Sequence, residues 1–285
     1  MPELPEVETV KRALAPEMEG YVFEGVKCNR KNLRFDFPKQ FAKRLTGSKV
    51  SGLARRGKYM LADLSSNETL VMHLGMSGRF SVLRPHHSNK PGDFHHDSET
   101  NPKHDHVLMD MSNGVRVVYN DPRRFGFMDL VKTDELEICR HFKGMGPEPL
   151  SNGFNDQALI DAFSGRSAPV KQALLDQRHV AGLGNIYVCE ALFRAGISPS
   201  RKAGNISAPR ISRLVREIRL VLEEAIEAGG SSLKDFASSD GSPGYFQHDF
   251  RIYGREGEDC RGCNRTIKRI TQGGRSTFYC GTCQR

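Results

Sequence analysis

The spacing of apolar positions changes along the chain and predicts a different secondary structure in each region. Residues 5–18 place Val7, Val10 and Leu14 three to four positions apart, which is the repeat of a short amphipathic helix. From about residue 20 to 131 the chain breaks into short runs rich in β-branched and aromatic residues, separated by Gly, Asn and Asp, which predicts an antiparallel sandwich or barrel. The runs are YVFEGV, LTGSKVSGLARR, KYMLADL, ETLVMHL, GRFSVL, HVLMDM, GVRVVYN and FGFMDLV.

A Gly/Pro-rich stretch, GMGPEPLSN, ends the β-rich region, and helical spacing follows it. The predicted helices are NDQALIDAFSG, PVKQALLDQ, GNIYVCEALFRAG and SAPRISRLVREIRLVLEEAIEAGG. We therefore expect an α+β multidomain protein. Its expected parts are a β domain at 1–132, a hinge linker at 133–151, a helical domain at 152–249 and a cysteine-bearing module at 250–285.

The stretch 84–106 interrupts the β-rich region and holds six of the ten histidines. A metal site there is conceivable, but the stretch is polar and rich in turn residues. We therefore expect a mobile loop between two strands.

The formal net charge is +8 and the isoelectric point is about 9.2, which favours an acidic polymer as partner, nucleic acid first and an anionic membrane surface second. No run of 18 apolar residues is present, and the charged N-terminus has no apolar signal-peptide core. We expect a cytoplasmic protein without a membrane-spanning segment. In that reducing compartment Cys28, Cys139 and Cys189 are expected as buried thiols.

The remaining four cysteines form two CxxC pairs separated by sixteen residues: Cys260, Cys263, Cys280 and Cys283. Paired thiolates at this spacing suit tetrahedral Zn²⁺, whereas two disulfides would need an oxidising compartment. Because all four ligands are cysteines, no coordination position is left for water, and the zinc is expected to be structural.

The segment between the CxxC pairs alternates on both sides of Gly273 and Gly274, which predicts a β-hairpin with Arg275 just after the turn. Residues 250–285 carry eight Lys/Arg against three Asp/Glu, a formal +5 before the zinc thiolates are counted. Such a hairpin suits contact with a nucleic-acid groove, although a solvated basic surface would have the same composition.

A glycine-rich loop, HVAGLGNIY, leads into the helix that contains Asn185. Gly182 and Gly184 would let the backbone approach a ligand, and the helix N-terminus suits a phosphate, to which Asn185 could donate. Because there is no GxGxxG and no following Lys, a nucleic-acid phosphate fits better than a bound nucleotide. The same letters also suit an ordinary corner between helices.

Seven motifs, in order along the whole chain, resemble those of one family. They are MPELPEVETV, RRGKY, HLGMSG, DPRRFG, AGLGNIYVCE, SDGSPGYF and the four-cysteine tail. The chain resembles the formamidopyrimidine-DNA glycosylases, the bacterial-type 8-oxoguanine DNA glycosylase/AP lyases. The resemblance implies a β-sandwich, a helix–two-turns–helix domain and a zinc finger, with damaged duplex DNA bound in the cleft between the domains. It implies one structural Zn²⁺, base excision repair as the activity, and a monomer that works at the bacterial nucleoid.

In this family the N-terminal proline attacks the damaged nucleotide, which implies that Pro2 is the nucleophile once Met1 is removed. An α-amine has a reference pKa of about 8, against about 10.4 for Lys, so more of it is free base at neutral pH. Taken alone, Pro2 would read as a residue that starts a helix or blocks degradation. Glu3 is expected to act as general acid/base, whereas Glu6 would relay protons, position water or simply start the helix, and Glu8 is expected at the surface.

The resemblance also implies roles for residues far from the N-terminus. Lys58 and Arg275 join Pro2 and Glu3 as catalytic residues, Lys58 by contacting the damaged nucleotide and its phosphate. Residues expected to fill the void left by a flipped base, which taken alone would partly read as core, are Met76, Arg123 and Phe125. Further DNA contacts are expected from His73, Arg166, Asn185 and Tyr245, the last in a mobile lid at 238–246.

Two other readings share parts of this pattern. Endonuclease VIII, a sister glycosylase for oxidised pyrimidines, also has the proline and the zinc finger, but it usually begins PEGPE and lacks the DPRRFG-type wedge. A non-catalytic zinc protein that binds DNA or the ribosome would explain the charge and the CxxC pairs. It would have no need of Pro2 beside Glu3.

Overall fold

Helix α1 (Leu4–Met18) begins the chain, as the spacing of its apolar residues predicted. Pro5 lies in its first turn, where a missing N–H costs nothing, and the helix continues through Pro16 for two residues. Its apolar face is fully buried and consists of Leu4, Val7, Val10, Leu14 and Met18.

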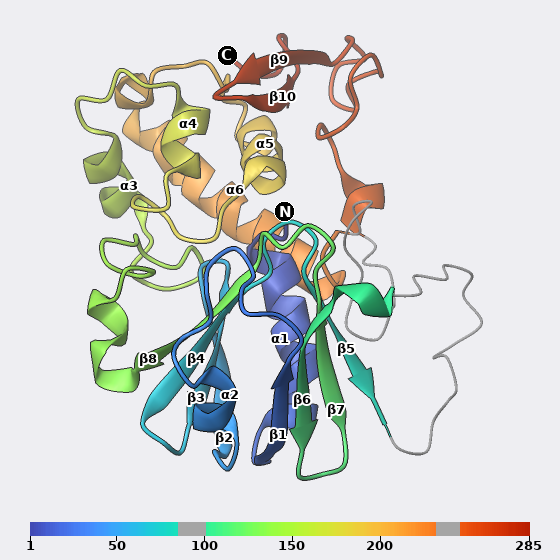
Figure 1. The fold of residues 1–285 in the computed structure, drawn as a ribbon. Helices are drawn as coiled ribbons and strands as arrows, with labels where there is room; N and C mark the ends of the chain where they lie inside the picture. Colours follow the sequence, from blue (N-terminus) through green and yellow to red (C-terminus); the bar gives the residue numbers. More distant parts are fainter. Residues whose placement is uncertain (85–100, 232–245) are drawn as a thin grey trace. The chain divides into compact units, whose positions relative to one another are not determined.

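The computed structural model describes residues 1–84, 101–231 and 246–285, which form two compact units (Figure 1). Of the described residues, the first unit comprises 1–84, 101–143 and 228–231. The second takes residues 144–227 and 246–285. Each unit has its own packing and is described by itself.

Two four-stranded antiparallel sheets make up most of the first unit, and all eight predicted strands are present. One sheet has the order β1-β6-β7-β5 and the other β2-β3-β4-β8. The strands are β1 (Phe23–Cys28), β2 (Val50–Arg56), β3 (Tyr59–Leu64), β4 (Glu68–His73), β5 (Arg79–Leu83), β6 (Asp105–Met111), β7 (Arg116–Asn120) and β8 (Phe127–Lys132). Helix α1 packs against strands of both sheets, and one apolar core is shared by the helix and the sheets.

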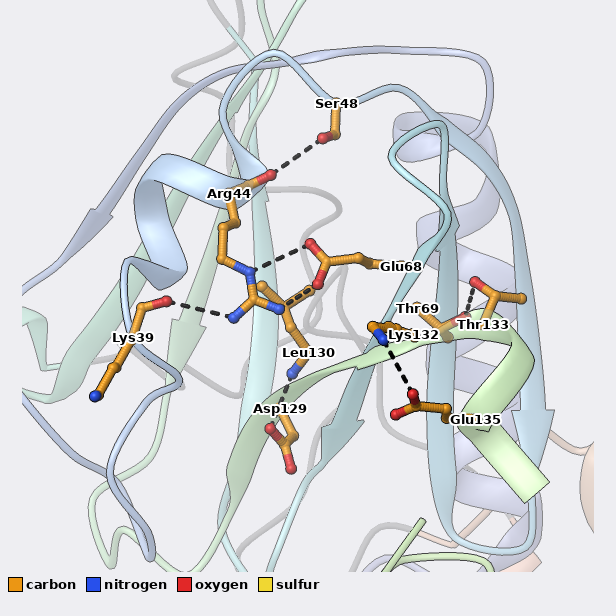
Figure 2. A network of polar contacts seen from close by, with 10 residues as sticks. All are labelled: Lys39, Arg44, Ser48, Glu68, Thr69, Asp129, Leu130, Lys132, Thr133 and Glu135. Atoms are coloured by element: carbon orange, nitrogen blue, oxygen red, sulfur yellow. Dashed lines mark hydrogen bonds and ion pairs between the residues drawn. The ribbon is translucent and has the colours of Figure 1, made fainter. Parts of the chain in front are cut away.

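Polar contacts fasten the first residue of β4, at the opposite end of the strand from His73. Figure 2 shows the Arg44 guanidinium, from helix α2 (Phe41–Leu45), between the Glu68 carboxylate and the Lys39 carbonyl. The next residue, Thr69, is fully buried and its hydroxyl lies 3.1 Å from that of Thr133. These contacts hold the N-terminal end of β4 in place.

The second unit contains the four predicted helices and the predicted hairpin. Helix α6 buries the expected stripe, Ile211, Leu214, Val215, Ile218 and Leu222. The elements are α3 (Asp156–Phe163), α4 (Val170–Leu175), α5 (Asn185–Arg194), α6 (Ala208–Glu227), β9 (Lys268–Gln272) and β10 (Arg275–Tyr279), with short 3-10 turns η3 (Ala203–Asn205) and η4 (Phe246–Asp249).

Some sequence expectations need qualification. Helix α2 and the turns η1 (Pro102–His104) and η2 (Thr133–Ile138) were not expected. Most of the histidine-rich stretch lies outside the described residues, but His106 belongs to β6 and is buried. Cys28, Cys139 and Cys189 are free thiols as expected, although only Cys189 is fully buried. Within the described ranges, no helix is long and apolar enough to cross a membrane.

Candidate active site and zinc centre

The N-terminal carboxylates are buried and hydrogen-bonded at the start of α1. Pro2 is buried directly before the N-cap Glu3, and Glu3 and Glu6 are only 3% and 2% exposed. A capping box joins them: Glu6 Oε2 accepts from the Glu3 N–H at 2.8 Å. The peptide group that follows Pro2 is therefore held in place by a side chain of the same helix.

The second oxygen of Glu6 holds a segment distant in sequence. Glu6 Oε1 accepts from the Ser231 N–H at 2.9 Å and from the Ser231 hydroxyl at 2.8 Å. Both carboxylate oxygens are thus used as acceptors. Glu6 therefore connects the start of α1 to Ser231, a structural role that the sequence alone did not indicate.

Lys58 lies in the tight turn between β2 and β3. The turn consists of Gly57 and Lys58, flanked by the paired residues Arg56 and Tyr59. Gly57 has φ +57°, the left-handed conformation that favours glycine in a two-residue hairpin turn. Lys58 is 8% exposed, so its position is set by packing as well as by the turn.

Asp121 joins the two loops that carry the expected void-filling residues. It is fully buried, and its Oδ1 accepts from the Ser77 hydroxyl at 2.6 Å while Oδ2 accepts from the Gly126 N–H at 2.8 Å. The Ser77 oxygen in turn accepts from the Arg123 N–H at 3.2 Å. The HLGMSG and DPRRFG motifs therefore form one rigid platform built around a buried carboxylate.

The platform presents the expected side chains at its surface. Arg123 is exposed, and its guanidinium lies over the Phe125 ring at 4.8 Å from the centroid. Phe125 itself is 44% exposed. Met76 is half-buried, and Arg124 adopts φ +55° between Arg123 and Phe125. Phe125 and Met76 are therefore not ordinary core residues.

We expect Gly126→Ala to destabilise this platform. A Cβ at Gly126 would overlap the Tyr119 hydroxyl and lie 2.7 Å from the His73 carbonyl oxygen. Overpacking of this kind costs about 1–3 kcal/mol of unfolding free energy, measurable by urea denaturation. Gly52→Ala, at a β2 position with open space around the added carbon, is the matched control and should change stability little. Equal effects of the two substitutions would contradict the packing argument.

His73 ends β4 in a stack of aromatic rings. Its ring lies 5.3 Å from that of Phe127 at 12°, and its Nδ1 accepts from the Gly75 N–H at 3.0 Å. Burial, together with the nearby charges of Lys58, Arg34 and His141, lowers the pKa of His73 to about 4. The imidazole is therefore neutral at physiological pH, with its proton on Nε2 and available for donation.

The lowered pKa of His73 predicts a pH dependence of stability. Between about pH 6.5 and 4 the unfolded chain binds a proton at this ring that the folded chain does not bind. Stability therefore falls on acidification through this window, by about 3 kcal/mol from this group. His73→Gln should remove that slope when unfolding free energies are measured from pH 4 to 7. Parallel curves for both proteins would contradict the assignment.

In the second unit, the start of β10 is held by side chains from two helices. The Ser276 carbonyl accepts from Asn185 Nδ2 and from Lys171 Nζ, both at 2.9 Å. Lys171 is fully buried and also donates to the Thr277 hydroxyl at 2.6 Å. These bonds fix the residue next to Arg275, whose own side chain is exposed at the hairpin turn.

Arg166 and Tyr245 are the two remaining residues expected to contact DNA. Arg166 is exposed after α3, and its Nε donates to the Ala162 carbonyl. Tyr245 and the expected lid at 238–246 lie outside the described residues, apart from Phe246, which begins η4 and is buried.

The four cysteines meet as the sequence predicted. The Sγ atoms of Cys260, Cys263, Cys280 and Cys283 all lie within 4.8 Å of one another. The cluster packs with apolar residues that include Cys189, Ile252 and Ile267. Four thiolates at this separation match tetrahedral Zn²⁺ and leave no open position, so the zinc is structural.

The structure also reveals groups that sequence reasoning missed. Glu8 was expected at the surface, which is wrong: it is 8% exposed and pairs with Arg55. Asp121 and Lys171 are also buried, although the sequence around them gives no sign that these charged side chains lie in the interior. Glu190 accepts from the N–H groups of residues 251–253 and orders the chain before the zinc module. The only sequence signal was a charged residue inside an otherwise apolar helix face.

Three family models match the chain in order. The formamidopyrimidine-DNA glycosylase N-terminal domain matches residues 1–128, the H2TH domain of the same enzymes matches 145–237, and a zinc finger found in FPG and IleRS matches 257–285. The chain is 60% identical to the formamidopyrimidine-DNA glycosylase of Ruegeria pomeroyi and 56% identical to that of Methylorubrum populi. These matches cover 100% of this chain, and 100% and 99% of the two relatives.

Solved structures agree with the sequence comparison. The fold is similar to the crystal structure of MutM (Fpg) from Thermus thermophilus, with a TM-score of 0.85 and 38% identity over 99% of this chain and 98% of that one. It is also similar to Lactococcus lactis Fpg in complex with DNA containing an abasic site, with a TM-score of 0.86 and 32% identity over 99% of each chain. The chain therefore belongs to the formamidopyrimidine-DNA glycosylase family, the DNA glycosylase/AP lyases that remove oxidised purines in base excision repair.

Proposed function

We propose that this chain excises 8-oxoguanine and formamidopyrimidines from duplex DNA with the nitrogen of Pro2 as nucleophile, and then cleaves the strand by β,δ-elimination. One observation carries the assignment to Pro2: the residue is buried directly before an N-cap whose N–H is held by the buried Glu6 carboxylate. A chain end held in this way suits a reacting group, because chain ends otherwise fray.

The proposed reaction begins with attack on the sugar. The Pro2 nitrogen, freed by removal of Met1, forms a bond to C1′, loses its proton to solvent, and the damaged base leaves with the electrons of the glycosidic bond. Glu3 protonates the ring oxygen as the sugar opens, which leaves a cationic iminium between nitrogen and C1′. The iminium acidifies the C2′ proton. Removal of the C2′ proton expels the 3′ phosphate, and a second elimination expels the 5′ phosphate.

Phosphate binding is assigned to donors in both units. Lys58 contacts the damaged nucleotide and its phosphate from the β2–β3 turn, and neutral His73 donates from Nε2. Arg275 supplies a guanidinium from the hairpin. Asn185 donates to a phosphate with the amide hydrogen that otherwise faces the Tyr253 hydroxyl at 3.5 Å, and Arg166 adds a more distant contact. Because His73 stays neutral, its contribution to DNA binding should not vary between pH 6 and 8.

Recognition of the duplex is assigned to the Asp121 platform. Met76, Arg123 and Phe125 fill the space left when the damaged nucleotide leaves the stack, and Arg123 pairs with the orphaned cytosine. The exposed position of Phe125, with the Arg123 guanidinium over its ring, supports this role because both side chains are accessible to a bound duplex. Tyr245 and the segment 238–246 are proposed to cover the flipped base.

We propose four functional parts along the chain. They are a catalytic β domain at 1–132, a linker at 133–151, a helix–two-turns–helix domain at 152–249 and a zinc finger at 250–285. The chain is proposed to act as a monomer on damaged duplex DNA of the bacterial nucleoid. Relatives crystallised with lesion-containing DNA support this partner.

Borohydride trapping tests the proposed function. The protein is incubated with duplexes that carry either 8-oxoguanine or thymine glycol, and borohydride then reduces any iminium to a stable amine. We expect a covalent adduct with the 8-oxoguanine duplex. No adduct with either duplex would rule out the Schiff-base mechanism, and an adduct with thymine glycol alone would indicate a pyrimidine glycosylase of the endonuclease VIII kind.

A further inference from the structure

Glu8 is a buried carboxylate on α1 that the proposed mechanism does not use. Its Oε1 accepts from Lys11 Nζ and Arg12 Nε, both at 2.9 Å, and its Oε2 accepts from Arg55 Nε at 3.2 Å. Burial opposes ionisation, but the hydrogen bonds from Lys11 and Arg12 and the charge of Arg55 keep the pKa of Glu8 below its ordinary value. The carboxylate is therefore ionised at neutral pH.

The three cations around Glu8 are not equivalent. Lys11 and Arg12 belong to α1 itself, so their pairs with Glu8 link no second element. The Arg12 side chain is 61% exposed, so its pair with Glu8 adds little to stability. Arg55 comes from β2, and its side chain is 11% exposed, as is that of Glu8. The Glu8–Arg55 pair therefore connects the helix to the sheet.

Arg55 carries this connection on to the hairpin turn. Its Nη1 donates to the Gly57 carbonyl at 3.0 Å, while its Nε remains on Glu8. Gly57 is the first residue of the two-residue turn, and Lys58 is the second. One planar guanidinium thus joins a carboxylate on α1 to the peptide group that links Gly57 with Lys58.

Helix α1 begins next to Pro2, so both ends of this connection lead to residues of the proposed reaction. We propose that Glu8 and Arg55 are positioning residues, which hold the turn carrying Lys58 in register with the helix that carries the Pro2 nucleophile. The inference rests on the proposed roles of Pro2 and Lys58. It assigns no contact between Glu8 and DNA.

The physical reason is the sensitivity of the reaction to geometry. A misplacement of about 1 Å at a positioning group can cost on the order of 10²-fold in rate. Lys58 has a long side chain, but its Cα position is set by the turn. The planar guanidinium of Arg55 bonds Glu8 and Gly57 at the same time. A lysine cannot replace Arg55 here, because its ammonium is a point charge without the fork of donors.

The test compares single-turnover rates of adduct formation on the 8-oxoguanine duplex. We expect Glu8→Gln to lower the rate by on the order of 10–100-fold. Arg12→Ala, which removes an exposed partner of the same carboxylate, is the matched control and should leave the rate unchanged. Arg55→Lys keeps the charge but loses the fork and should also slow the reaction, so that the proposal remains testable if Glu8→Gln folds poorly.

A double-mutant cycle with Lys58→Gln separates positioning from general destabilisation. If Glu8 acts through Lys58, adding Glu8→Gln to Lys58→Gln should slow the reaction no further. Independent, multiplicative losses would overturn the proposal, as would a normal rate in both Glu8→Gln and Arg55→Lys. Failure of the wild-type protein to form any adduct would instead count against the proposed function itself.

Discussion

Pro2→Gly is expected to lose most strand cleavage while keeping its affinity for DNA. Glycine leaves a primary amine, whose imine can lose its N–H proton and become neutral. The iminium formed on a proline nitrogen carries no N–H, so it remains a cation and keeps acidifying the C2′ proton. Loss of the ring also frees the amine to rotate, and we expect a rate loss on the order of 10²-fold.

The measurement is single-turnover cleavage of an 8-oxoguanine duplex, with binding to an uncleavable abasic analogue measured in parallel. Pro5→Ala is the matched control, because it changes another buried proline in the first turn of α1 and leaves the N-terminal amine intact. Normal cleavage by Pro2→Gly would remove Pro2 from the mechanism. A chain that retains Met1 should also be inactive, because the Pro2 nitrogen is then part of a planar amide.

Loss of the structural zinc is expected to have the second large effect. In Cys263→Ser the cluster has three thiolates, and a small module whose folding depends on its metal should lose order. The hairpin β9–β10 would then no longer present Arg275. Each charge-assisted phosphate contact is worth about 1.5–3 kcal/mol, so DNA affinity should fall by on the order of 10–100-fold.

Zinc content and DNA affinity should be measured on the same protein. Cys28→Ser, a cysteine in β1 far from the cluster in sequence, is the matched control and should keep both. A Cys263→Ser protein that has lost zinc but binds DNA with unchanged affinity would show that the module is dispensable for binding.

Local sequence signals predicted most of the fold correctly. The apolar repeat of α1, the eight strands, the four helices of the second unit and the hairpin around Gly273 and Gly274 all depend on spacing within a few residues. The zinc ligands were equally readable, because a CxxC turn brings two thiolates together by itself. The unpredicted elements, α2, η1 and η2, are short pieces in which side-chain spacing has too few positions to show a period.

For the candidate site, too, the sequence indicates which residues to consider but not their surroundings. Pro2, Glu3, Lys58, Arg123 and Phe125 could be proposed as site residues from motifs, because each lies in a continuous stretch of chain. What those motifs could not supply is the environment of each group. The sequence letters are the same whether Glu8 is exposed or buried, and whether His73 is charged or neutral.

The sequence by itself determined most of the element types, the zinc centre and the order of the motifs, since these follow from local periodicity and from short ligand spacings. Only the tertiary structure decided that Glu6 holds Ser231, that Asp121 unites two loops and that Arg55 joins Glu8 to the Lys58 turn. It also decided that His73 is neutral. Each of these properties depends on atoms tens or hundreds of residues apart in the chain, and burial and electrostatics act through distance in space rather than along the sequence.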